Sequence, residues 1–167
     1  MIDITRWVHS MAGSFHLVAA VIGLLTGAYL LLALKGTIFH KRLGYVFSGA
    51  LIVVNISALF IYDFNAGKPS IFHYLIFVSM FCLIYGLYPM FQKPAKPGRY
   101  RKHIKGMIGA ALGLWAAGAP EYFVRELAQG LSGAQLITYS FLISAPFALL
   151  IGFSIWYHIH KTKWGKI

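Results

Sequence analysis

Four histidines occupy regular positions in a strongly apolar sequence, and their side chains can bind a metal. His16 and His73 lie at the start of two apolar stretches, and His40 and His103 lie at the start of the stretches that follow them. Neutral imidazole suits iron and brings no charge into lipid. Two histidines at one depth on facing helices can supply both axial ligands of a haem. The pattern predicts such pairs if the apolar stretches are membrane-spanning helices.

The composition places the chain in a lipid bilayer. Its 167 residues are 59% hydrophobic and only 11% charged, whereas a soluble domain has about 25% charged residues. So few polar groups cannot coat a water-soluble globule. The net charge of +11 comes from short basic runs between apolar stretches, which indicates membrane topology and not nucleic-acid binding. We therefore expect an integral protein of the cytoplasmic (inner) cell membrane with no nucleic-acid partner.

Five apolar stretches are long enough to cross a bilayer, which requires about 20 helical residues. The predicted spans are 12–34, 40–62, 71–91, 103–125 and 134–160. The sequence thus predicts an all-α, multi-pass bundle that forms a single membrane domain over residues 1–167.

The basic residues fix the direction of these spans. Of 15 lysines and arginines, only Arg6, Lys68 and Arg125 fall on the side that also holds all four acidic residues. Cytoplasmic loops of membrane proteins are enriched in lysine and arginine. The amino terminus is therefore predicted outside the cell and the carboxyl terminus in the cytoplasm. His16 and His73 then belong near the outer face, and His40 and His103 near the inner face.

The two halves of the first four spans resemble each other. The motifs Phe-His-Leu and Phe-His-Tyr contain His16 and His73, and the motifs His-Lys-Arg-Leu-Gly and His-Ile-Lys-Gly begin at His40 and His103. Each half holds two spans, so both enter the membrane in the same direction. This predicts a four-helix core built as a parallel two-helix repeat. In such a core His16 faces His73 and His40 faces His103.

Simpler interpretations of the histidines stay open. A histidine at a helix end can reach the lipid headgroups, and the neighbouring Lys41 and Lys105 favour that role for His40 and His103. Basic residues beside these histidines could instead pair with haem propionates, although their more common role is to set the topology. His158, close to the end of the chain, is expected to be a residue of the tail.

A stripe of small residues also has two interpretations. Ala20, Gly23 and Gly27 follow His16 on about the same helical face. They can leave room for a flat porphyrin, or they can let two membrane helices pack closely.

Glu121 is the acidic residue nearest to the predicted outer pair. Pro120 before it can kink the helix, and Glu121 could then relay protons beside His16 and His73. An ion pair with Arg125, four residues later, is the favoured alternative. The sequence contains no catalytic triad, phosphate loop or CxxC pair, so we assign no catalytic residue.

Residues from His16 to about Glu126 resemble a bacterial membrane protein family of unknown function (number two-three-zero-six). The resemblance rests on Gly23, Gly27 and the histidine motifs described above, together with Lys35-Gly36 and Met107. It implies membrane location but no reaction.

The histidine arrangement is also similar to transmembrane b-type cytochromes of the ascorbate-dependent (five-sixty-one) kind. That resemblance implies haem b, with His16 and His73 binding one iron and His40 and His103 binding another. The chain departs from the pattern because its histidines lie very near the helix ends and no ascorbate site is recognisable.

From these observations we expect a small electron-transfer protein with one or two bis-histidine haems, in the class of membrane oxidoreductases. Its expected partners are the lipid bilayer and a quinone or another redox protein, and association with a second copy is left open. The alternative is a haem-free transporter, assembly factor or anchor subunit that uses histidine as a proton or metal relay.

Overall fold

The computed structural model describes residues 7–8, 10–62 and 67–162, and these contain helices but no strand. A helix forms at each of the five predicted stretches, and a short π-helical turn, η2, follows the fourth. The elements are α1 (Met11–Leu32), α2 (Ile38–Ala58), α3 (Ile71–Phe91), α4 (Arg99–Tyr122), η2 (Phe123–Leu127) and α5 (Gly133–Lys161).

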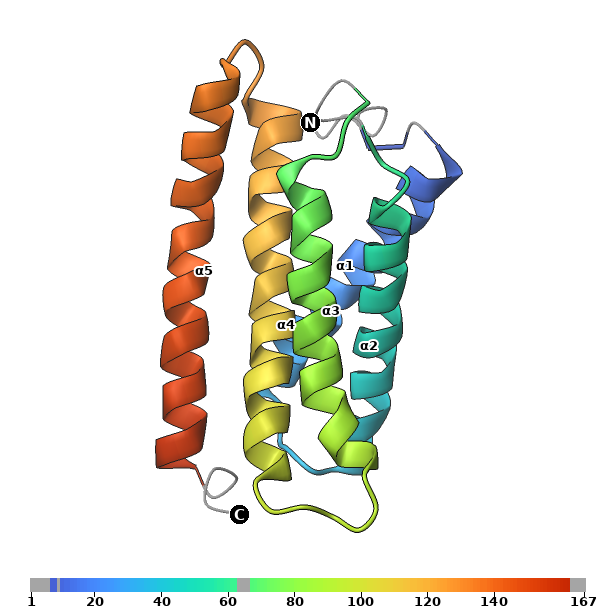
Figure 1. Ribbon diagram of the computed structural model, residues 1–167, viewed down its shortest axis with the longest axis vertical. Helices are drawn as coiled ribbons and strands as arrows, with labels where there is room; N and C mark the ends of the chain where they lie inside the picture. The colour runs from blue at the N-terminus through green and yellow to red at the C-terminus, as the bar shows by residue number, and fades with distance from the viewer. Residues whose placement is uncertain (1–6, 9, 63–66, 163–167) are drawn as a thin grey trace.

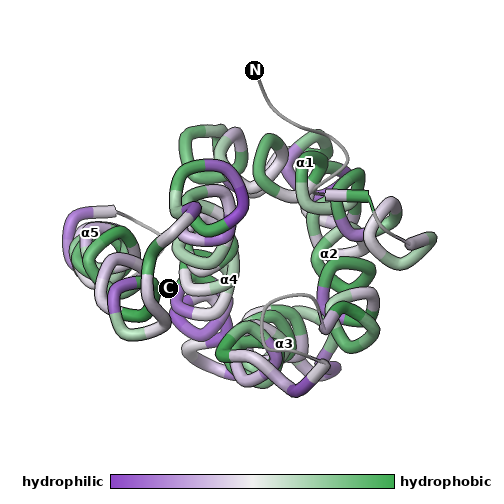
Figure 2. The backbone as a smooth tube through the Cα atoms, turned by 90° about the horizontal axis from the view of Figure 1, so that it is seen from above, coloured by the Kyte–Doolittle hydropathy of each residue, from purple (hydrophilic) through white to green (hydrophobic). Residues whose placement is uncertain are grey.

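Helices α1 to α4 form a closed bundle, and α5 lies against the outside of α4 (Figures 1 and 2). Each of the four bundle helices packs on its neighbour in the chain, and α1 also packs on α4. Helices α1 and α3 therefore face each other across the bundle, as do α2 and α4. No residue of α5 is buried, which means that the core is made by the first four helices.

Local signals set the first turn of α2, which carries His40. Gly36 has a φ of 82°, a left-handed conformation that glycine adopts at little cost. The Thr37 side chain then accepts a hydrogen bond from the backbone N–H of His40 at 3.0 Å, as helix N-caps commonly do. His40 is therefore held in the first turn of α2 by the loop before it.

Two helices begin or end about four residues from the predicted span limits. Helix α2 ends at Ala58 and not at residue 62, and α4 begins at Arg99 and not at residue 103. Gly98, with a φ of 73°, places the start of α4 in a basic segment that hydropathy alone assigns to a loop. Hydropathy marks where lipid begins and not where helical hydrogen bonds begin.

Among the described residues, three helices are long and apolar enough to cross a membrane: α1, α3 and α5. Basic residues reduce the apolar character of the other two, because α2 carries Lys41 and Arg42 and α4 begins with a run of arginines and lysines. The structure thus confirms an all-helical chain with membrane-compatible helices, and gives three clear candidates for membrane spans.

The closest approach within the bundle is between α3 and α4. A Cβ atom added to Gly106 would lie 2.5 Å from the carbonyl oxygen of Cys82 and from the Cα of Gly86. Both are backbone atoms of α3, so the two helices meet here backbone to backbone. Small residues at such crossings are the usual means by which helices associate in lipid. This contact sets the position of the inner end of α4.

Candidate functional site

The rings of His40 and His103 meet inside the bundle, at the end where α2 and α4 begin. Their centroids lie 6.4 Å apart and their planes are inclined by 78°. The two residues belong to α2 and α4, which face each other across the bundle, so the pair spans its interior. Of the two predicted pairs, this is the one whose rings the structure brings together.

A backbone carbonyl orients His103. Its Nδ1 lies 2.9 Å from the carbonyl oxygen of Gly86 on α3. A carbonyl can only accept, so Nδ1 carries the proton and Nε2 keeps a free lone pair in the neutral ring. Histidines that bind metals are usually held in this way by a second hydrogen bond. The Gly86–Gly106 contact keeps this carbonyl within reach of the imidazole.

His40 has an unsatisfied nitrogen. Its Nδ1 is buried and has no hydrogen-bond partner among the described residues. A buried polar atom without a partner is costly and rare, and each instance calls for an explanation. His40 therefore leaves one polar atom in the interior for which no group of the described chain provides a partner.

Both rings line a cavity of about 560 Å³. That volume falls within the range of small-molecule and cofactor sites, which are mostly apolar with a few polar groups. Its apolar walls come from all four bundle helices and include Gly27, Phe47 and Ala111. At Gly27 an added Cβ would lie 2.9 Å from the Phe47 ring, so this glycine serves close packing and borders the cavity as well.

Cationic and hydroxyl groups gather on the same cavity. Its polar lining residues are Lys35, Lys41, Tyr45, Arg99, Tyr100 and His158. The Lys35 ammonium donates to the Leu31 carbonyl at 2.9 Å and also to the Leu30 carbonyl. Burial lowers the pKa of Lys35 from its usual range. The cavity is thus apolar over most of its wall and positively charged over the rest.

Three groups at this site escaped the sequence analysis. Lys35 was expected as one of the cytoplasmic basic residues and as part of a family motif, and His158 as a tail residue, yet both line the cavity. The Gly86 carbonyl holds His103 although no side chain marks it. Spacing along one helix cannot find such groups, because each reaches the site through the packing of a different helix.

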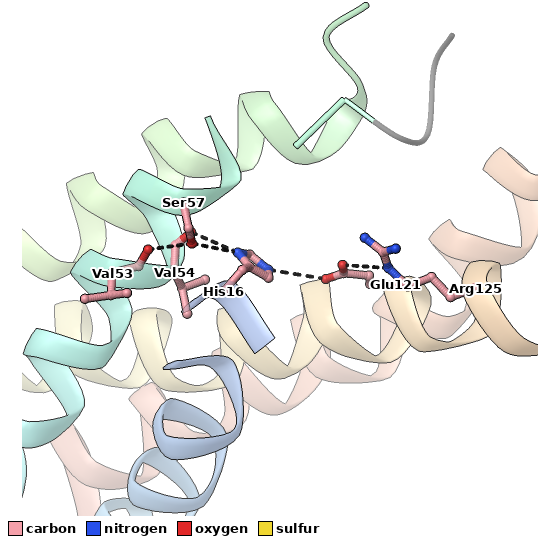
Figure 3. Close-up of polar contacts among 6 residues, drawn as sticks. All are labelled: His16, Val53, Val54, Ser57, Glu121 and Arg125. Atoms are coloured by element: carbon pink, nitrogen blue, oxygen red, sulfur yellow. Dashed lines mark hydrogen bonds and ion pairs between the residues drawn. The ribbon is translucent and has the colours of Figure 1, made fainter. Parts of the chain in front are cut away.

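His16 lies at the opposite end of the bundle, where α1 begins, and contacts other partners. Its Nδ1 lies 3.1 Å from the Val54 carbonyl oxygen and 3.1 Å from Ser57 Oγ. Its Nε2 lies 3.7 Å from Oε2 of Glu121 (Figure 3). Both ring nitrogens therefore already face protein groups, and the imidazole links α1 to α2 and to α4.

Glu121 contacts both of its candidate partners. Its Oε1 accepts a hydrogen bond from Arg125 Nε at 3.1 Å, while Oε2 faces His16. The side chains of Glu121 and Arg125 are only 15% and 7% exposed. Glu121 therefore forms the expected ion pair with Arg125 and also lies beside His16, in one mostly buried network (Figure 3).

His73 does not meet His16 in a ring contact among the described residues. Its Nδ1 accepts a hydrogen bond from the Ser70 backbone N–H at 3.1 Å, and its ring packs on Tyr62 at 4.7 Å. Since Nδ1 accepts, the proton of the neutral ring lies on Nε2, which is buried without a partner among the described residues. In this arrangement neutral His73 has no lone pair on Nε2 for a metal in the bundle, and Nε2 of His16 faces the Glu121 carboxylate at 3.7 Å.

The described residues contain no cluster of three or more histidine, cysteine or acidic side chains that could hold a metal ion. A bis-histidine site needs only two such ligands. Comparison with protein-family models, with curated proteins and with solved structures finds no match to the chain.

Proposed function

We propose that this protein is a small b-type cytochrome of the membrane that transfers electrons, with one haem b bound by His40 and His103. The observation that carries the proposal is the spacing of the two rings, 6.4 Å between centroids. A metal–imidazole bond is about 2 Å long and each ring centre lies about 1 Å behind its nitrogen. One iron held by both His40 and His103 would therefore require ring centres about 6 Å apart.

The donor set fits this cofactor. His103 presents a free Nε2 because Nδ1 donates to Gly86, and His40 has a buried nitrogen without a partner among the described residues. Haem supplies one-electron chemistry through the ferric and ferrous states of its iron. The chain holds the two imidazoles, orients one of them through a carbonyl, and surrounds the site with apolar walls that limit the access of water.

The sidedness of the bundle belongs to the same proposal. We place all five helices across the membrane, with the cavity near the cytoplasmic face where the basic residues gather. Helices α2 and α4 pack between the more apolar helices over similar lengths, which supports a crossing by all five. In this proposal the electron donor is a quinol in the bilayer and the acceptor is a redox protein. The family resemblances described above belong to the same proposal.

A second haem on His16 and His73 stays a prediction. His16 would have to break its contact with Glu121 or its contacts with Val54 and Ser57 on α2. The proton of the neutral His73 ring would have to move from Nε2 to Nδ1. The one-haem form of the proposal needs no such rearrangement.

Spectroscopy of the purified protein tests the proposal. Protein from haem-replete cells, purified in detergent, should show a Soret band and a sharp α band in the reduced-minus-oxidised spectrum. His40→Ala and His103→Ala should each lose these bands, whereas His160→Ala, in an exposed position on α5, should keep them. His16→Ala should also keep the bands if the single haem lies at the inner end. A colourless wild-type preparation that takes up no added haem would overturn the proposal.

A haem-free transporter is the second candidate, and the buried network of His16, Glu121 and Arg125 favours it. An ionisable network inside a membrane bundle commonly marks a proton or ion path. This alternative predicts a colourless protein whose pH-dependent flux in proteoliposomes is lost in Glu121→Gln. Wild-type protein with a haem spectrum and no flux would exclude it.

A further inference from the structure

Lys35 places a half-buried cation at the cavity, and none of the described residues forms an ion pair with it. The acidic residues that the structure describes, Glu121 and Glu126, lie at the opposite end of α4. Taking a charge out of water is costly unless an opposite charge or several hydrogen bonds compensate it. Within the described part of the chain, the site therefore presents a positive charge without a counter-charge.

The hydrogen bonds of Lys35 leave room for one more acceptor. An ammonium group has three N–H donors, and two of them go to the carbonyls of Leu30 and Leu31. These carbonyls belong to the last turn of α1, so they fix the ammonium where the helix ends. The remaining N–H can serve a ligand in the cavity.

Arg99 lines the same cavity, and its guanidinium donates to the Tyr100 hydroxyl at 2.8 Å. A ligand that matches this cavity is therefore apolar over most of its surface and carries carboxylates on one edge. Arginine and lysine are the side chains that bind carboxylates most strongly, through charge-assisted hydrogen bonds.

We infer that Lys35 and Arg99 bind the propionate carboxylates of the haem, which turns that edge of the cofactor toward the inner, basic end of the bundle. This inference rests on the proposed function and adds the orientation of the cofactor and the residues that set it. Lys35 is the central residue, because it is half-buried and already anchored to α1. Lys41, which also lines the cavity, is exposed and can remain solvated whether or not the cofactor is bound.

The experiment compares haem b with its dimethyl ester, in which both carboxylates are neutral. Apoprotein is placed in nanodiscs of neutral phosphatidylcholine, so that anionic headgroups cannot replace the ligand. Each cofactor is titrated into wild type, Lys35→Met and Lys105→Met, and binding is followed at the Soret band. Lys105 is the matched control, because it is an exposed lysine at the same end of the bundle that does not line the cavity.

A hydrogen bond to a charged group contributes enough that its loss weakens binding about tenfold. We expect Lys35→Met to bind haem b about tenfold more weakly than wild type, and Lys105→Met to bind it like wild type. Both variants should bind the dimethyl ester as wild type does. Lys35→Arg should recover most of the affinity for haem b, since it restores the charge.

The possible results separate the two proposals. Wild type that binds haem b with the same affinity as Lys35→Met would overturn the role of Lys35 and leave the proposed function intact. Equal weakening for haem b and for the ester would show that Lys35 acts only by holding the end of α1, which also overturns the inference. Wild type that binds neither cofactor would overturn the proposed function itself.

Discussion

Replacing Gly106 by alanine should separate α3 from α4 and disturb the site at His103. The added Cβ would lie 2.5 Å from the Cys82 carbonyl oxygen and from Gly86 Cα, whereas ordinary contacts are 3.4–4 Å. Both neighbours are backbone atoms, so no side chain can turn away to make room. The helices must therefore move apart locally by about 1 Å, the difference between these distances.

Two consequences follow from this displacement. Overpacking of this kind costs about 1–3 kcal/mol. The bond of 2.9 Å from His103 Nδ1 to the Gly86 carbonyl would also lengthen beyond hydrogen-bond range. Loss of such an orienting partner typically lowers the affinity for a metal about 10–100-fold. We expect both effects in Gly106→Ala.

Thermal unfolding in detergent, followed by tryptophan fluorescence, measures the first effect, and haem titration measures the second. Gly113→Ala is the matched control, because it lies on the same helix and an added Cβ meets nothing within 4 Å. Alanine favours the helix more than glycine does, so this control should be as stable as wild type or slightly more so.

The reasoning is refuted if Gly106→Ala unfolds at the wild-type temperature, because the backbone contact would then not determine the packing. It is refuted equally if Gly113→Ala destabilises the protein as much as Gly106→Ala does. If Gly106→Ala is destabilised yet binds haem with unchanged affinity, the link between this contact and His103 is wrong.

Three further predictions concern the core, the outer network and the topology. Phe47→Ala should lower the free energy of unfolding by about 3 kcal/mol, because the Phe47 side chain is fully buried. Denaturation in a titration with sodium dodecyl sulfate measures this change, and an unchanged midpoint would contradict the prediction. Glu121→Gln should destabilise the fold by about 2 kcal/mol because the charge-assisted hydrogen bond from Arg125 Nε to Oε1 is lost, and in the same assay the double variant with Arg125→Leu should cost less than the sum of the two single changes. With the native cysteine removed, an impermeant maleimide should label Lys68→Cys but not Lys96→Cys in intact cells, and the opposite pattern would reverse the proposed topology.

Much of the fold can be predicted from local features of the sequence. Each helix lies where an apolar stretch was identified, because hydropathy and turn signals act over a few neighbouring residues. The boundaries at Ala58 and Arg99 were missed because hydrogen-bonded helix continues into polar sequence and ends within apolar sequence.

The site was harder to predict because the charged residues beside a histidine do not determine the direction in which its ring points. The repeat predicted that His40 faces His103, whereas Lys41 and Lys105 favoured the headgroups for both; the two rings lie 6.4 Å apart inside the bundle. His16 was predicted to face His73 with Glu121 nearby, and it lies 3.7 Å from Glu121 instead of meeting the His73 ring. Successive residues of a helix are rotated by about 100°, so a small error in helix rotation sends a side chain to a different neighbour.

The sequence by itself determined the helical class of this protein and the presence of helices apolar enough for a membrane, because these follow from composition and from local periodicity. It also marked the four histidines as the residues most able to bind a metal. Only the tertiary structure decided which histidines meet, that Gly86 orients one of them, and that Lys35 and His158 line the same cavity. Those relations depend on how α3 approaches α4 and on which helices face each other, and no spacing within a single helix encodes them.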